Sequence, residues 1–316
     1  MTLRSYLDLV EIRTKVASII PFLIGSVYAI FRFHEFNVYH FVLMLISLLS
    51  FDMFTTVMNN YYDFKKARKK EGYGYQIHNV IVKDNLKERT VVTIIILLFL
   101  IATVTGIVLV FQTGLLLFLL GGLSFLVGIL YSFGPIPISR MPLGEIFSGL
   151  FMGFVIIFIS TYIHVWDDQL VSLAFDQQHL MVHIDIIEVL LIFLISIPAV
   201  LCIANIMLAN NICDMDEDIE NKRYTLPVYI GKSYALILFR CIYYASFLDL
   251  IVLGFLKVNP IIIALILLTL IPVRKNMNAF MSKQTKKDTF GLAVRNFLIM
   301  NTARIVALGM ATVMAL

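Results

Sequence analysis

Four polar side chains lie near the end of the second apolar run, in the segment FDMFTTVMNNYYDFKKARKK. Asp52, Thr56, Asn59 and Asp63 are separated by four, three and four residues. On an α-helix these spacings place side chains on one face, so the sequence predicts a polar stripe there. Carboxylate and amide oxygens in one stripe are the kind of ligands that a hard cation such as Mg²⁺ takes.

A second stripe lies at the end of the sixth apolar run, in NIMLANNICDMDEDIENKRYTLP. Asn210, Asp214, Asp218 and Lys222 recur at every fourth residue, again on one helical face. Further acids beside this stripe are Asp216, Glu217 and Glu220. The same Asn-x3-Asp pattern therefore occurs at equivalent ends of two apolar runs.

Two facing carboxylate stripes indicate a shared ligand, because carboxylates alone in a low-dielectric site repel one another. Mg²⁺ removes this repulsion, keeps one or two protein carboxylates and shares its other positions with water and substrate phosphates. Neighbouring Lys and Arg side chains would hold the remaining phosphate oxygens. The apolar runs would house a hydrocarbon tail. The pattern thus predicts a lipid diphosphate as substrate.

The charged segments also allow other interpretations. Both stripes could be solvated faces that cap two helices, and the basic run 65–70 is best explained as a segment that orients the chain. An EF-hand at Asp214 fails, because Ile219 and Thr225 occupy the positions that need Gly and Glu. The sequence contains neither a P-loop nor a GxSxG motif.

The composition specifies the elements that must position these stripes. Of 316 residues, 60% are apolar and 15% are charged, and the mean hydropathy is +0.90. These values exclude a water-soluble domain, a disordered chain and a nucleic-acid-binding module. Apolar runs lie near 16–33, 39–60, 91–111, 114–132, 142–164, 186–208, 233–256, 259–273 and 292–315. We therefore predict an all-α, polytopic bundle of about nine transmembrane helices, in one domain spanning residues 1–316.

The basic residues predict how this bundle is oriented in the bilayer. Assigning alternate loops to alternate sides puts 20 of the 25 Lys and Arg residues on one side and only Arg32 and Lys257 on the other. The positive-inside rule then places the N-terminus in the cytoplasm and the C-terminus outside, in the plasma membrane. The active site would face the cytoplasm. Histidines 164, 179 and 183 are expected at the surface of the outer loop.

The two stripes also carry a family resemblance that extends over most of the chain. Asn59 to Asp63 resembles a motif NDxxDxxxD, and Asp214 to Leu226 resembles DxxxDxxxGKxTL. Together with RTKVASIIPFLIGSVYA, YSFGPIPISRMPLGE and NTARIVAL, in this order, they resemble the UbiA superfamily of intramembrane prenyltransferases. Within it, the chain is most similar to the 1,4-dihydroxy-2-naphthoate polyprenyltransferases of menaquinone synthesis.

The chain departs from the family pattern at three places. Asn60 stands where the first motif has its second acid, and Ala67 and Lys69 lie where its last acid would be. Asn221 is assigned to the glycine of the second motif. Asp63 is then the one carboxylate left in the first motif, unless Glu71 or Asp84 substitutes. Restoring the acid with Asn60→Asp is expected to tighten Mg²⁺ binding. In the alternative interpretation, Asn60 is a hydrogen-bonding spacer that donates to Asp63 or to a neighbouring loop, and the acid would raise the Mg²⁺ requirement.

The resemblance implies a reaction and a role for individual residues. An allylic polyprenyl diphosphate would ionise, and an aromatic acceptor would attack the allylic cation. The catalytic residues would be Asp63, Asp214 and Asp218, which with Asn59 would hold Mg²⁺. Substrate contacts are expected from Lys222, Arg223 and Arg140 at the diphosphate, from Tyr61, Tyr62 and Tyr131 at the allylic cation, and from Arg13 at the acceptor carboxylate.

Alternatives remain open within and outside this family. The acceptor could be 4-hydroxybenzoate or a haem instead of 1,4-dihydroxy-2-naphthoate. A secondary transporter of an anionic metabolite would need charges near the midplane, and Asp249 and Arg304 are the residues that allow it. A lipid-linked phosphotransferase of the CDP-alcohol type is disfavoured, because its DGxxAR signature does not occur.

Overall fold

The computed structural model describes residues 1–66, 79–134, 137–166, 170–176 and 179–315 of the chain. Nine helical segments in these residues are long and apolar enough to cross a membrane, in agreement with the sequence prediction. The helices of the first half are α1 (Leu3–Leu9), η1 (Ile12–Lys15), α2 (Val16–Phe33), α3 (Val38–Lys66), α5 (Val80–Lys83), α6 (Glu88–Thr113), α7 (Leu115–Ser132), η2 (Ile138–Arg140), α8 (Gly144–Ser148), η3 (Gly149–Val155) and α9 (Ile156–Tyr162).

The second half is also helical after one short hairpin. Its elements are β1 (Val171–Asp176), β2 (His179–Ile184), α10 (Ile186–Cys213), α11 (Met215–Glu220), α12 (Leu226–Ile230), α13 (Lys232–Ala245), α14 (Asp249–Phe255), α15 (Pro260–Leu268), α16 (Leu270–Ser282) and α17 (Phe290–Ala315). The two strands are antiparallel, and Val171 pairs with Ile184. The hairpin adds a small sheet to the predicted all-α bundle, in the loop between the fifth and sixth spans.

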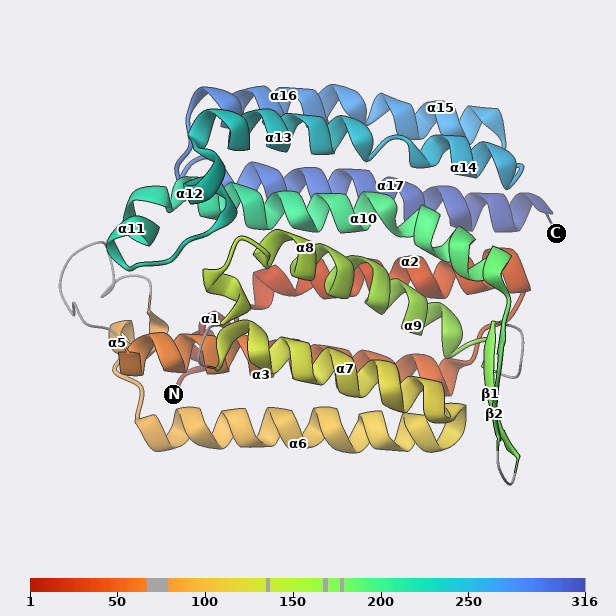
Figure 1. Cartoon of the computed structure of the whole chain (residues 1–316), viewed down its shortest axis with the longest axis horizontal. Coiled ribbons are helices and arrows are strands. Elements are labelled where there is room, and N and C mark those ends of the chain that lie inside the picture. Colours follow the sequence, from red (N-terminus) through yellow and green to blue (C-terminus); the bar gives the residue numbers. More distant parts are fainter. Residues whose placement is uncertain (67–78, 135–136, 167–169, 177–178, 316) are drawn as a thin grey trace.

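The long helices run side by side, so the bundle has two distinct ends (Figure 1). We call the end that carries α5, α11, α12 and the N-terminus the polar end, and the opposite end, with β1, β2 and the C-terminus, the hairpin end. Both polar stripes lie at the polar end, because α3 and α10 finish there. Termini at opposite ends agree with an odd number of spans.

The eighth span is longer than its apolar run of 259–273 indicates, because it continues through α16 to Ser282. The last turns of α16 are amphipathic. Val273, Met277 and Phe280 are buried on one face, whereas Arg274 and Lys275 are exposed. A helix can continue past the end of its apolar run when one face still packs against a neighbour.

The fifth span is pressed closely against α10. A Cβ atom added to Gly153 would lie 2.6 Å from the Cα atom of Val200, and one added to Gly149 would lie 2.8 Å from the carbonyl oxygen of Val200. Only glycine allows so close an approach between two helices. The η3 segment that contains these glycines is a π-helix, a local widening that is frequent at functional sites.

Candidate functional site

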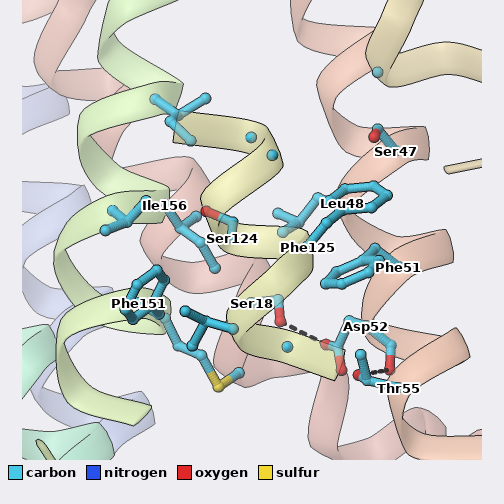
Figure 2. Close-up of a pocket in the computed structure, with 18 of the residues that line it drawn as sticks. Ser18, Ser47, Leu48, Phe51, Asp52, Thr55, Ser124, Phe125, Phe151 and Ile156 are labelled. Atoms are coloured by element: carbon cyan, nitrogen blue, oxygen red, sulfur yellow. Dashed lines mark hydrogen bonds between the residues drawn. The ribbon is translucent and has the colours of Figure 1, made fainter. Parts of the chain in front are cut away.

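A cavity of about 500 Å³ lies between α3, α6, α7 and the fifth span. Its walls are mostly apolar and aromatic, and Figure 2 shows Phe51 and Phe125 close together with Phe151 and Ile156 on the opposite wall. The rings of Phe51 and Phe125 stack with centroids 3.9 Å apart, which joins α3 to α7. This cavity, called here the apolar cavity, has the lining expected of a site for a hydrocarbon chain.

A smaller cleft of about 150 Å³, called here the polar cleft, brings together residues from both halves of the chain. Its lining residues are Asn59, Tyr62, Asp63, Tyr131, Ser132, Pro137, Ser139, Arg140, Met207, Asn210 and Arg223. Six of them were predicted as site residues from the sequence: Asn59, Asp63, Tyr62, Tyr131, Arg140 and Arg223. The structure thus places the ends of α3 and α7, the η2 turn and the segment after α11 around one cleft.

The two cavities meet at three residues, because Asn59, Tyr131 and Ser132 line both of them. Tyr131 is fixed at this junction. Its hydroxyl accepts a hydrogen bond from Ser148 Oγ at 3.2 Å and donates to Met207 Sδ at 3.5 Å. A ligand with a charged head in the polar cleft and a long apolar tail in the apolar cavity would pass this tyrosine.

The acids of the second stripe lie beside the polar cleft, and both have cationic partners. Asp214 Oδ2 is 3.5 Å from Asn210 Nδ2 and 2.6 Å from Lys286 Nζ. Asp218 forms an ion pair with Arg223 at 3.3 Å and accepts a hydrogen bond from Thr225 Oγ1 at 3.0 Å. Burial raises the pKa of the Asp218 carboxyl, and the guanidinium of Arg223 opposes this shift.

The donor set of this region fits a hard divalent cation. Asn59, Asp63 and Asn210 line one cleft, and Asp214 contacts Asn210 at its edge. In the described residues, no three Asp, Glu, His or Cys side chains gather into a site complete by themselves. Mg²⁺ does not need such a cage, because it completes its coordination with water and substrate phosphates.

The backbone corrects the alignment of the second motif. Asn221 has a φ of −86°, whereas Lys222 has a φ of 54°, in the left-handed region that favours glycine. The motif glycine is therefore replaced by Lys222, and the motif lysine by Arg223. The side chain of Lys222 is exposed. Neither Lys222 nor Arg13, which is also exposed, is among the described residues that line the two cavities.

Asn60 and Tyr61 are not among the described residues that line the polar cleft, and their side chains form hydrogen bonds with other segments. The Asn60 amide donates to the carbonyl oxygen of Leu9 at 3.2 Å and to Glu11 Oε1 at 3.3 Å. These hydrogen bonds agree with the interpretation of Asn60 as a spacer that contacts the N-terminal segment. Tyr61 donates to Glu88 Oε1 of α6 at 2.7 Å. Glu71, which was considered as a substitute acid, lies outside the described residues.

Two basic residues at the site escaped sequence reasoning. Lys286 lies between α16 and α17 and was counted only among the charges that orient the chain, although it contacts Asp214. Lys15 is buried and pairs with Asp52 at 2.6 Å. The pair of Lys15 and Asp52 had one signal in the sequence, which is a lysine placed where a span begins.

Asp249 and Arg304, which left a transporter possible, form a structural ion pair. Arg304 Nε and Nη2 each lie 2.6 Å from one oxygen of Asp249. Arg304 also donates to the carbonyl oxygens of Met300 and Ser246, both at 2.9 Å. Both side chains are buried, and neither is among the described residues lining the two cavities. Their charges are thus satisfied within the bundle.

Comparison with known proteins agrees with this geometry and with the resemblance drawn from the two motifs. The profile of the UbiA prenyltransferase family matches residues 18–298. A 1,4-dihydroxy-2-naphthoate octaprenyltransferase of Bacillus subtilis (strain 168) is 32% identical over 226 residues, which cover 71% of this chain and 65% of that relative.

Solved structures share the fold at low sequence identity. A UbiA homologue from Archaeoglobus fulgidus, bound to GPP and Mg²⁺, has a TM-score of 0.62 and 16% identity, and the match covers 98% of this chain and 99% of that one. A UbiA homologue from Aeropyrum pernix K1 has a TM-score of 0.67 and 18% identity over 92% of this chain and 97% of that one.

Proposed function

The chain belongs to the UbiA prenyltransferase family, and from this premise we propose that it transfers a polyprenyl group from an allylic polyprenyl diphosphate to 1,4-dihydroxy-2-naphthoate, giving demethylmenaquinone in its reduced, quinol form. The chain is a multi-pass membrane protein. The observation that carries the proposal is the junction of a polar cleft and an apolar cavity at Asn59 and Tyr131. That shape fits a diphosphate head joined to a long hydrocarbon tail.

In the proposed complex the diphosphate lies in the polar cleft. Arg223 and Arg140 line this cleft and would bind the diphosphate oxygens, whose negative charge grows as the leaving group departs. Asn59, Asp63, Asp214 and Asp218 would hold Mg²⁺, which when bound supplies positive charge to the departing diphosphate. The use of Mg²⁺ is supported by the neighbour from A. fulgidus that was solved with GPP and Mg²⁺.

Transfer of the prenyl group exchanges one bond for another. The allylic C–O bond breaks and its electron pair leaves with the diphosphate, while an aromatic carbon supplies the pair for the new C–C bond. The bond between the ring and its carboxylate then breaks, CO2 leaves, and the electron pair of that bond restores the aromatic ring. Tyr131, at the junction, and Tyr62, which packs on Phe133 with ring centroids 5.1 Å apart, would shield the allylic cation from water.

We also propose that the polar end of the bundle faces the cytoplasm, in the plasma membrane. The support is the distribution of 20 against two basic residues between alternate loops. Mg²⁺ would then reach the polar cleft from the cytoplasm, and the released diphosphate would leave to the same side. A single cysteine is introduced next to Asn221 after Cys202, Cys213 and Cys241 are replaced by Ser. Labelling it with a membrane-impermeant reagent tests this orientation, since only inverted vesicles should react.

A product assay tests the reaction. Purified protein is incubated with Mg²⁺, farnesyl diphosphate and, separately, 1,4-dihydroxy-2-naphthoate, 4-hydroxybenzoate or haem, and products are identified by mass spectrometry. The proposal expects a prenylated naphthoquinol that has lost the carboxyl group. Product only with another acceptor would replace the proposed acceptor, and no product with any acceptor would reject prenyl transfer.

Variants of the acids test how the site works. Asp63→Ala and Asp214→Ala should abolish turnover while the protein stays folded in detergent. Asp218 is buried and paired with Arg223 and Thr225, so Asp218→Asn is the safer variant at that position. Near-normal activity in any two of these variants would end the proposal that they hold Mg²⁺.

A further inference from the structure

A buried ion pair lies beside the apolar cavity, between its aromatic part and the polar cleft. Lys15 Nζ of η1 is 2.6 Å from Asp52 Oδ1 of α3. The lysine side chain is 2% exposed and lies behind the wall, whereas that of Asp52 is 16% exposed and lines the cavity. Figure 2 shows Asp52 joined to Ser18 on one side, with Thr55 next to it. The cavity therefore contacts the carboxylate and not the ammonium group.

The four side chains that contact Asp52 already use their polar hydrogens. Lys15 Nζ directs its three protons to Asp52 Oδ1 at 2.6 Å, the Asp52 carbonyl oxygen at 3.2 Å and Thr56 Oγ1 at 2.7 Å. Ser18 donates to Asp52 Oδ2. Thr55 and Thr56 donate to the Asp52 carbonyl oxygen at 3.0 and 2.9 Å. None of these four side chains keeps a proton for a ligand.

What remains toward the cavity is capacity to accept hydrogen bonds. An ionised carboxylate can accept about four hydrogen bonds, and the side-chain oxygens of Asp52 receive one from Lys15 and one from Ser18. This part of the wall is thus suited to a ligand group that donates, such as a hydroxyl. It is unsuited to a ligand carboxylate, which needs hydrogen-bond donors. Lys15 lies directly behind Asp52 but does not change this, because its protons are already used.

Asp52 lies on α3 at a position from which it could contact the acceptor during the reaction. Asp52 and Asn59 are seven residues apart on the same helix and line the same cavity, so about 10 Å of helix axis separates them. Phe51 lies next to Asp52 and stacks on Phe125. A flat ring on this wall would have its edge near Asp52 and its reacting carbon on the side of the polar cleft.

We propose that Asp52, held by Lys15 and Ser18, accepts a hydrogen bond from a ring hydroxyl of the aromatic acceptor and so selects hydroxyl-bearing arenes. This inference rests on the proposed function and specifies the acceptor site within it. A hydroxyl that donates to a carboxylate also becomes more electron-releasing toward its ring, which favours attack by the ring carbon. The acceptor is thereby recognised by its hydroxyl and not by its carboxylate.

Binding of three unreactive probes tests the inference without turnover. Wild-type protein in detergent is titrated with 1-naphthol, naphthalene and 1-naphthoate, and binding is followed by calorimetry. We expect 1-naphthol to bind about tenfold or more tightly than naphthalene, as a hydrogen bond to a charged group provides. Equal binding of 1-naphthol and naphthalene, or tighter binding of 1-naphthoate than of 1-naphthol, would overturn the inference.

A double variant supplies the matched control. Asp52→Leu alone would leave a buried ammonium without its partner and could unfold the protein. Lys15→Met together with Asp52→Leu removes both charges and keeps the volume similar. In this variant 1-naphthol should lose its advantage over naphthalene, with thermal unfolding measured to verify the fold. A folded double variant that retains the advantage would refute the role of Asp52.

Kinetics separate this inference from the proposed function. If wild-type protein transfers prenyl groups, the double variant should raise the KM for the acceptor at least tenfold and leave the KM for the prenyl diphosphate unchanged. A rise of both constants by the same factor would indicate general damage and reject selection by Asp52. If wild-type protein transfers no prenyl group, the proposed function fails, and the probe titrations still decide whether Asp52 binds a hydroxyl.

Discussion

The side-chain amide of Asn60 donates a hydrogen bond to the carbonyl oxygen of Leu9 across 3.2 Å and thereby ties α3 to α1. The same amide lies 3.3 Å from Glu11 Oε1, and the backbone carbonyl oxygen of Asn60 accepts a hydrogen bond from Asn79 Nδ2 at 3.0 Å. Asn60 thus connects three segments of the polar end. Its amide nitrogen is needed as a donor, so an acid cannot replace it.

Asn60→Asp should therefore destabilise the protein by roughly 1 kcal/mol, because a carboxylate cannot donate to Leu9 and would face Glu11. The Mg²⁺ concentration for half activity should stay the same or rise. Unfolding in SDS and a metal titration of the variant beside wild type measure both effects, with Asn60→Ala as the control that removes the donor without adding charge. Unchanged stability together with a lower Mg²⁺ requirement would restore Asn60 as a lost ligand.

Lys286→Met should tighten Mg²⁺ binding in the absence of diphosphate. Lys286 Nζ lies 2.6 Å from Asp214 Oδ2 and occupies an oxygen that the metal would use. The lysine is half exposed, so the gain should be limited to about two- to fivefold, as for other solvent-exposed ion pairs. Electron paramagnetic resonance of bound Mn²⁺ gives the affinity directly, and Lys287→Met serves as the neighbouring control. Equal affinity in the two variants would mean that Lys286 does not compete with the metal.

Local spacing was sufficient to predict part of the site. Asn59 and Asp63, and likewise Asn210 and Asp214, are one helical turn apart, so the period of the helix alone places each pair together. Nine spans also follow from apolar runs whose lengths match a bilayer. These features depend on residues close in sequence, and the structure agrees with them.

Contacts between distant segments could not be predicted in this way. Lys286 reaches Asp214 from another loop, and Lys15 reaches Asp52 from η1, at the start of the preceding span. Both pairs depend on how the spans pack, which neither periodicity nor charge counts specify. The left-handed backbone at Lys222 likewise depends on the turn after α11. The motif alignment assigned the glycine to Asn221, one residue too early, and so did not indicate that Lys222 occupies the glycine position.

Lys222→Gly should raise the free energy of unfolding by roughly 0.5–1 kcal/mol. Glycine removes the steric cost of φ 54°, and this gain exceeds the entropy that the more flexible residue loses on folding. Lys222→Ala is the matched control, since it removes the ammonium group and retains the strained backbone. In SDS unfolding, only the glycine variant should have a higher free energy of unfolding than wild type. Equal loss of activity in both variants would mean that the ammonium group acts on the substrate. Full activity in both would mean that Lys222 has only a structural role in the turn.

His164, at the hairpin end, is expected to make the stability of the protein depend on pH. It was expected at the surface, but its side chain is buried and stacks on Phe36 with ring centroids 4.7 Å apart. His164 Nδ1 accepts a hydrogen bond from the backbone nitrogen of Asn37 at 3.0 Å, which requires the neutral ring. Burial, and then the neighbouring His40, lower the pKa of His164 to about 4.

Acidification should therefore destabilise the protein through His164. In the unfolded chain the pKa of this group returns to about 6.5, so between pH 6.5 and 4 the unfolded state binds more protons than the folded state, and stability falls as pH falls. At pH 5 the loss relative to pH 7.5 should be about 2 kcal/mol. His164→Gln can still accept a hydrogen bond from Asn37. This variant should be less stable than wild type at pH 7.5 and should lose less stability between pH 7.5 and pH 5. His179 is exposed, so His179→Gln should depend on pH as wild type does. SDS unfolding at both pH values measures the difference, and parallel losses in wild type and His164→Gln would assign the acid sensitivity to another group.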